Sequence, residues 1–146
     1  MLLLPIVAYA IKLLLSKAIV AKLKNLRYDC WMDIRLLETE RLYLRNFKIS
    51  DFAAVHEYAS LESFSQYQIW GPNSEQDTLE FLQDRISAAL QEPRVVYDMA
   101  IVLKATDQLI GGALIELESS NSKVACLGYA MNPKFQNQGY TTEIAQ

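Results

Sequence analysis

The sequence predicts an α/β (α+β) domain in which helices flank a mixed, mostly antiparallel sheet. Three observations support this fold class. Apolar and polar residues alternate with a period of two over residues 42–45, which is typical of a strand. A segment that begins at Ser74 has a helix-capping pattern followed by apolar residues at helical spacing. Three apolar segments of strand length, separated by turn-forming residues, then fill residues 97–131.

The composition limits the classes of function. The chain has 146 residues, of which 51% are hydrophobic, so it can bury a core and is not a disordered chain. Residues 32–146 hold nine basic and sixteen acidic side chains, and this acidic body argues against a nucleic-acid partner. One histidine and two separated cysteines offer no metal site and no Ser–His or Cys–His pair, and they favour a reduced, cytoplasmic setting.

Residues 1–31 form an apolar and basic extension ahead of the domain at residues 32–146. Residues 2–11 carry no charge, but Lys12 interrupts them, so the apolar run is too short to span a bilayer. No basic segment precedes it and no small-residue cleavage pattern follows it, which argues against a secretory signal. Three interpretations stay open: a membrane-surface segment at residues 1–24, a packed helix, or non-native upstream sequence that leaves Met32 as the natural start.

The first part of the domain is predicted as a strand followed by a helix. Residues 36–47 form the strand, with one apolar and one polar face. Ser50 is a good N-cap for a helix that runs to Ala59. Residues 61–73 then read as an aromatic loop that ends in Gly-Pro-Asn.

The clearest helix of the chain begins with a capping box formed by Ser74 and Asp77, and Pro93 ends it. Residues 97–104 and 108–117 follow as the two strands of a hairpin, in which Gly111 and Gly112 indicate a bulge or a close approach of backbones. The predicted buried stripe of the helix comprises Leu79, Leu82, Ile86, Ala89 and Leu90.

The last part of the chain, residues 123–146, organises the rest. Residues 124–131 are predicted as a buried strand with Cys126 in the core. A break at Asn132 and a polar loop lead to Gly139, at the mouth of a helix whose first turn is residues 142–145. A loop that ends in a helix N-terminus presents unpaired backbone N–H groups, so the sequence predicts a phosphate-binding site here.

This loop resembles the coenzyme-A loop of the GNAT superfamily of N-acetyltransferases, whose pattern is Gln/Arg-x-x-Gly-x-Gly/Ala. The chain reads Gln136-x-x-Gly139-x-Thr141 at this place. The surrounding LGYAMNPKFQNQGYTTE and the earlier ETERLYLRNFKISD are similar to the branch that acetylates ribosomal-protein N-termini and related amines. The resemblance covers residues 32–146 and implies the front half of the acyl-CoA N-acyltransferase fold, without the later strands and helix.

The resemblance also implies acetyl-CoA as the acetyl donor, with no metal, and an amine acceptor on a protein N-terminus or a small molecule. The end of the last strand would pair with the pantetheine arm and offer an oxyanion donor. Asn137 and Thr141 depart from the family pattern, where small residues are usual. The implied cofactor-binding residues are Ala130, Met131, Asn132, Gln136, Asn137, Gln138, Gly139, Tyr140 and Thr141.

The general base is the least specific part of this hypothesis. Many relatives carry an acidic residue where Cys126 stands. Glu116 and Glu118 share one face at the end of a strand and are the candidate catalytic residues. Two alternatives stay open: the glutamates only solvate the strand end, or a water relay takes the proton.

A second hypothesis follows from the later strands and helix of the family fold, which the resemblance does not cover. The chain would then be an inactive remnant that binds coenzyme A weakly or not at all. Its last strand would present an exposed apolar edge, which predicts self-association.

Overall fold

The computed structural model describes residues 35–146 except residues 67, 69, 121 and 122. The predicted extension at residues 1–31, with all three of its interpretations, lies outside the described residues. Within the described part of the chain, no helix has the length and apolar character needed to cross a bilayer.

Five strands form one sheet in the order β1-β2-β3-β4-β5. All four neighbouring pairs are antiparallel, so the predicted parallel component is not found among the described strands. The strands are β1 (Leu37–Glu38), β2 (Leu42–Asn46), β3 (Val96–Leu103), β4 (Gln108–Leu117) and β5 (Ala125–Met131). The helices are η1 (Ile49–Asp51), α4 (Phe52–Ala59), α5 (Glu62–Ser65), α6 (Glu75–Ala89), η2 (Pro133–Phe135) and α7 (Tyr140–Ala145).

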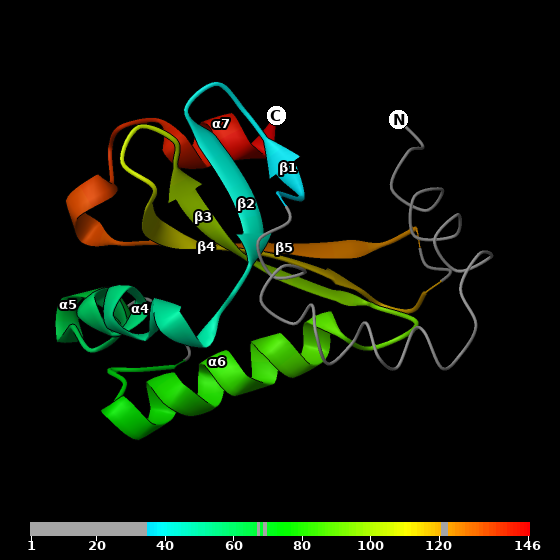
Figure 1. The fold of residues 1–146 in the computed structure, drawn as a ribbon, viewed down its shortest axis with the longest axis horizontal. Helices are drawn as coiled ribbons and strands as arrows, with labels where there is room; N and C mark the ends of the chain where they lie inside the picture. Colours follow the sequence, from blue (N-terminus) through cyan, green and yellow to red (C-terminus); the bar gives the residue numbers. More distant parts are fainter. Residues whose placement is uncertain (1–34, 67, 69, 121–122) are drawn as a thin grey trace. The chain divides into compact units, whose positions relative to one another are not determined.

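The helices cover both faces of the sheet. Figure 1 shows α4, α5 and α6 on one face and α7 on the other. The face under α4 and α6 is filled by side chains such as Tyr43, Val102 and Leu82, and the face under α7 by Leu44, Ile101 and others. The sheet therefore has two apolar layers, and α7 completes the second one.

The prediction of one strand over residues 36–47 is wrong, because a turn divides this segment into β1 and β2. The turn is closed by the Thr39 N–H, which donates to Leu42 O at 2.9 Å. The expected polar face is also absent from β2, whose five residues are all buried. Arg45 can lie inside because its guanidinium makes a two-pronged contact with Asp51, with both N–O distances 2.8 Å.

The predicted N-cap at Ser50 is wrong, since Ser50 lies within the 3₁₀ turn η1. Asp51 organises this corner instead, because its carboxylate accepts the Lys48 N–H at 2.8 Å as well as Arg45. The predicted loop at residues 61–73 contains the short helix α5. Phe64 of α5 is buried edge-on against Tyr58 of α4, which explains why this segment is ordered as a helix.

The capping box at Ser74 is confirmed. The Ser74 Oγ accepts the Asp77 N–H at 3.2 Å, and the Asp77 carboxylate accepts the Ser74 N–H at 2.9 Å. In the predicted stripe of α6, Leu82 and Ala89 are buried, whereas Leu90 is 41% exposed beyond the helix end. Thr78 is also buried, and its Oγ1 lies 2.9 Å from His56 Nδ1, so a side-chain hydrogen bond links α6 to α4.

The β3–β4 hairpin and the close approach at Gly111 are confirmed. A Cβ at Gly111 would lie 2.3 Å from Ala130 O, so only glycine lets β5 pair this closely with β4. The prediction that β5 is buried holds at Met131 but is wrong at the start of the strand, where Leu127 is 59% exposed and Cys126 is also exposed. In the described part of the chain β5 pairs with β4 alone, so its outer edge is open.

Candidate functional site: a backbone anion-binding loop

The site lies where β5 passes into α7. The strand end is held by the Asn132 N–H, which donates to Ile110 O at 2.9 Å, and by the Asn132 side chain, which accepts the Lys134 N–H at 3.1 Å. The side-chain amide of Gln136 donates a hydrogen bond to Met131 O at 3.2 Å. The loop therefore starts from a fixed strand end.

Two residues of the loop have left-handed backbone conformations, Asn137 with φ 60° and Gly139 with φ 79°. Glycine and asparagine are the residue types that adopt this region most readily, so the departure from the family pattern at Asn137 is compatible with the turn. The helix α7 follows Gly139 directly and begins at Tyr140, two residues before the predicted first turn at Thr142.

The backbone N–H groups of residues 137–141 are the chemical feature of this loop. The Gln138 N–H closes a turn onto the preceding residues, whereas the N–H groups of Gly139, Tyr140 and Thr141 make no hydrogen bond to another described residue. Left-handed residues in a tight loop can turn backbone N–H groups toward one concave side, and the start of α7 leaves its own N–H groups free for an anion. The loop can therefore hold a phosphate or diphosphate through its main chain.

The outer edge of β5 continues this site along the strand. In an antiparallel pair, alternate residues direct their N–H groups to the same neighbour. Because the Asn132 N–H is bonded to β4, the N–H groups of Tyr129 and Met131 face the open edge. The Asn132 N–H is bonded to β4 and is not available as the oxyanion donor. Of the predicted residues 130–132, only Met131 directs its N–H to the open edge, and Tyr129, which was not among the residues predicted from the sequence, does the same.

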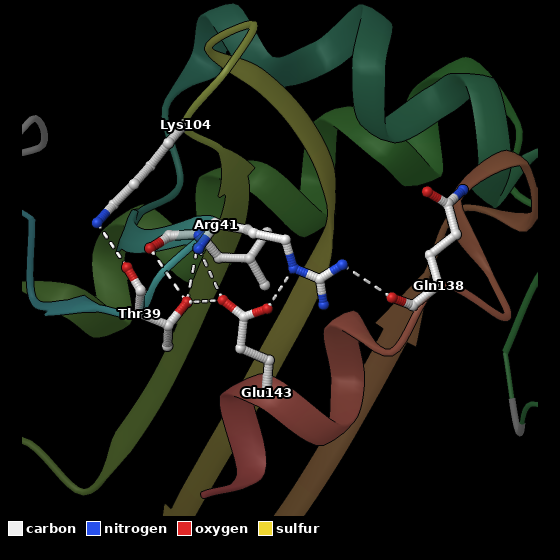
Figure 2. Close-up of polar contacts among 6 residues, drawn as sticks. Thr39, Arg41, Lys104, Gln138 and Glu143 are labelled. Atoms are coloured by element: carbon white, nitrogen blue, oxygen red, sulfur yellow. Dashed lines mark hydrogen bonds and ion pairs between the residues drawn. The ribbon is translucent and has the colours of Figure 1, made fainter.

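A polar network behind the loop was missed from the sequence (Figure 2). Arg41, just before β2, donates from Nε to Glu143 of α7 at 2.6 Å and from Nη1 to Gln138 O at 3.0 Å. Its guanidinium lies over the ring of Tyr140, with the Cζ atom 4.5 Å from the ring centroid. Thr39 also donates to the Glu143 carboxylate. These partners are about a hundred residues apart in the chain, so no local pattern could have identified them.

The electrostatics of this network follow from its donors. Hydrogen bonds from the Thr39 hydroxyl, together with those from the Arg41 backbone and side chain, lower the pKa of Glu143 to about 2. Glu143 is thus ionised throughout the physiological range. An open depression of about 580 Å³ lies over the same corner and is lined by Glu40, Arg41, Gly139, Thr142, Glu143 and Gln146.

The candidate bases Glu116 and Glu118 are exposed and lie at the other end of the β4–β5 pair. Glu116 is opposite Cys126, whereas Met131 is opposite Gly111. At ~3.3 Å per residue, this places Glu116 roughly 16 Å along the strand from the loop. The structure does not bring these carboxylates together with the anion loop, and their catalytic role stays a prediction.

One further carboxyl group has a strongly altered pKa. Asp98 of β3 lies under α6, where burial raises its pKa to about 6 even though Arg85 and Arg94 oppose the shift. Its carboxylate is 3.1 Å from Arg85 Nε of α6. This contact ties α6 to the sheet and assigns Asp98 a structural role.

Comparison with known proteins decides the family. The model of the acetyltransferase (GNAT) domain matches residues 41–146. The chain belongs to the GNAT acetyltransferase family. YnaD of Bacillus subtilis (strain 168), an uncharacterised N-acetyltransferase, is 28% identical over 110 residues, which cover 75% of this chain and 61% of YnaD.

Solved GNAT structures share the fold. The acetyltransferase (GNAT family) from Bacillus anthracis has a TM-score of 0.65 at 28% identity, over 75% of this chain and 60% of that chain. The RimL ribosomal L7/L12 alpha-N-protein acetyltransferase, in complex with coenzyme A, has a TM-score of 0.61 at 22% identity, over 75% of this chain and 62% of that chain. This chain thus spans 60–62% of the length of the three relatives. The predicted acetyltransferase fold is confirmed.

Proposed function

We propose that this GNAT chain transfers the acetyl group of acetyl-CoA to a primary amine. The observation that carries the proposal is the set of free backbone N–H groups at residues 139–141, positioned between the open edge of β5 and the start of α7. Such a loop suits the diphosphate of coenzyme A, because main-chain N–H groups and a helix N-terminus both favour a bound anion.

The remaining geometry supports an extended ligand. With the diphosphate at Gly139, the pantetheine arm would run along the outer edge of β5 and accept or donate hydrogen bonds at Met131 and Tyr129. The thioester would then lie part-way along the strand, away from the loop. The amine would attack the thioester carbonyl, forming the C–N bond and expelling the thiolate of coenzyme A, and holding both reactants accounts for much of the acceleration.

The amine must lose a proton during this reaction. Glu116 and Glu118 remain the candidate bases, because both are exposed carboxylates at the end of β4, the strand that pairs with β5. A water relay is the alternative route for the proton. Substitution of each glutamate by glutamine separates them: the base is the residue whose loss lowers kcat while the KM for acetyl-CoA is unchanged.

The acceptor is proposed as an amine without further definition. One relative of this fold is named for acetylating the ribosomal protein L7/L12, but at 22% identity it supports the fold and not the acceptor. Both a protein N-terminus and a small-molecule amine therefore remain candidate acceptors.

Isothermal titration of the 146-residue chain with acetyl-CoA tests the proposal. We expect one saturable site, and we expect Gly139→Ala to weaken binding by roughly tenfold, because a left-handed alanine costs about 1–2 kcal/mol. Gly71→Ala is the matched control, since Gly71 also has a positive φ, of 81°, but lies outside the loop.

A wild-type chain that gives no binding heat would rule out the proposal, and so would equal losses of affinity in the two glycine variants. Release of free thiol in the presence of amines then measures turnover. Weak binding without turnover, or no binding heat together with aggregation, would support the second hypothesis, an inactive remnant that binds coenzyme A weakly or not at all.

A further inference from the structure

The β1–β2 turn is hydrogen-bonded to α7, although the two segments are about a hundred residues apart in the chain. We propose that this turn is a clamp that holds the anion loop in its binding conformation, with Arg41 and Glu143 as positioning residues. The inference rests on the proposed function for the identity of the ligand, but the clamp itself is a property of the free chain.

Glu143 is the anchor of the clamp on α7. One carboxylate oxygen accepts the Thr39 hydroxyl and the Arg41 N–H, the latter at 2.8 Å, and the other oxygen accepts Arg41 Nε at 2.6 Å. Three donors from one short turn therefore converge on a single side chain. Charge-assisted bonds of this kind are shorter and stronger than neutral ones, so they fix the first turn of α7 against β2.

The turn is itself held in place by the β3–β4 hairpin. Lys104, which follows β3, donates from Nζ to Thr39 O at 2.6 Å (Figure 2). Its Nζ also lies 3.0 Å from the Glu38 carboxylate. The Lys104 N–H also donates to Arg41 O at 2.9 Å. The clamp is thus anchored on the central strands of the sheet and not on a free turn.

Arg41 carries the effect of the clamp into the loop. Its Nη1 donates to Gln138 O at 3.0 Å, one peptide before Gly139. Because a trans peptide is planar, the carbonyl of Gln138 and the N–H of Gly139 point in opposite directions. A carbonyl held toward Arg41 therefore fixes the Gly139 N–H away from it, in the orientation that a bound anion needs.

The alternative orientation of this peptide would be harmful to binding. Gly139 permits a wide range of backbone dihedrals, so the preceding peptide can rotate if nothing holds it. A rotated peptide would present the carbonyl oxygen of Gln138, and not an N–H group, to the anion. Arg41 prevents this rotation from behind the loop and need not touch the ligand.

Nuclear magnetic resonance relaxation of the ligand-free chain tests the clamp directly. We expect the Gly139 amide of the wild type to be rigid, with an order parameter near ~0.8, and to fall below ~0.6 in Arg41→Gln. Arg41→Lys keeps the charge but lacks the planar fork, so it should hold only one of the two partners and give an intermediate value. Lys123→Gln is the control for loss of one positive charge, because Lys123 is exposed ahead of β5, at the opposite end of that strand from the anion loop.

Titration with coenzyme A is the second measurement. We expect Arg41→Gln and Glu143→Gln to weaken binding by about tenfold while Lys123→Gln stays at the wild-type value. Equal order parameters at Gly139 in the wild type and in both Arg41 variants would overturn the clamp. If Gly139 becomes mobile in the Arg41 variants but the wild type binds no coenzyme A, the clamp is supported and the proposed function is rejected.

Discussion

At the scale of single residues, the site depends on backbone conformation more than on side-chain chemistry. Asn137 and Gly139 supply the two left-handed positions that turn successive N–H groups toward one place. The Glu143 side chain accepts hydrogen bonds from Thr39 and Arg41, and Arg41 in turn contacts the loop at Gln138 O.

The pH dependence of folding stability should reveal the contribution of the ionised Glu143 side chain. Its pKa is about 2 in the folded chain and lies below the ordinary value of 4.5, so its stabilising contribution is fully present above pH 4.5 and is lost as pH falls toward 2. Urea unfolding at pH 5 and pH 3 should show a larger loss of stability in the wild type than in Glu143→Gln. Equal losses in the two proteins would contradict the assignment.

At the scale of secondary-structure elements, α6 is the helix whose start is most clearly set by local chemistry. The reciprocal bonds of Ser74 and Asp77 satisfy two of the N–H groups that a helix start leaves free. Tertiary contacts then fix the rest of the helix against the domain: Leu82 is buried in the core, and Thr78 contacts His56 of α4.

Ser74→Ala should destabilise the domain by about 1 kcal/mol, because the Asp77 N–H loses its acceptor at a helix start. Urea unfolding followed by far-ultraviolet circular dichroism measures this change. Ser87→Ala is the control in the same helix, where alanine is the better helix former and no loss is expected. A Ser74→Ala variant as stable as Ser87→Ala would show that the cap contributes nothing.

At the scale of the whole molecule, the open edge of β5 is the main departure from a closed domain. Val124 and Leu127 are 66% and 59% exposed beside a strand that has one neighbour in the described part of the chain. Unpaired apolar edges favour association between molecules, so the predicted self-association of this 146-residue chain has a physical basis.

Sedimentation velocity over a range of concentrations tests this expectation. We expect the wild type to associate as its concentration rises and Leu127→Lys to remain monomeric, because a charge at the edge opposes strand pairing. Leu90→Lys is the control, since Leu90 is also exposed but lies beyond the end of α6. A wild type that stays monomeric, or an equal effect of the two lysines, would exclude the β5 edge as the contact.

Much of the order of elements could be predicted from the sequence, as the Ser74 cap, the β3–β4 hairpin and the close approach at Gly111 show. The cap and the hairpin depend on residues that are near one another in the chain, and the glycine pair at 111–112 signals a close approach without naming Ala130 as its partner. The errors lie where distant partners decide. The period of two in β2 failed because Arg45 is buried through Asp51, and Cys126 was placed in the core although no described strand covers it.

The sequence by itself determined the chemistry of the anion loop, since Asn137 and Gly139 are the residues that tolerate its backbone conformation without help from elsewhere. Only the tertiary structure decided what holds that loop, because Arg41 and Glu143 meet across 102 positions of chain. A local pattern reports propensities over a few residues, whereas that contact exists only after the sheet has brought β2 beneath α7.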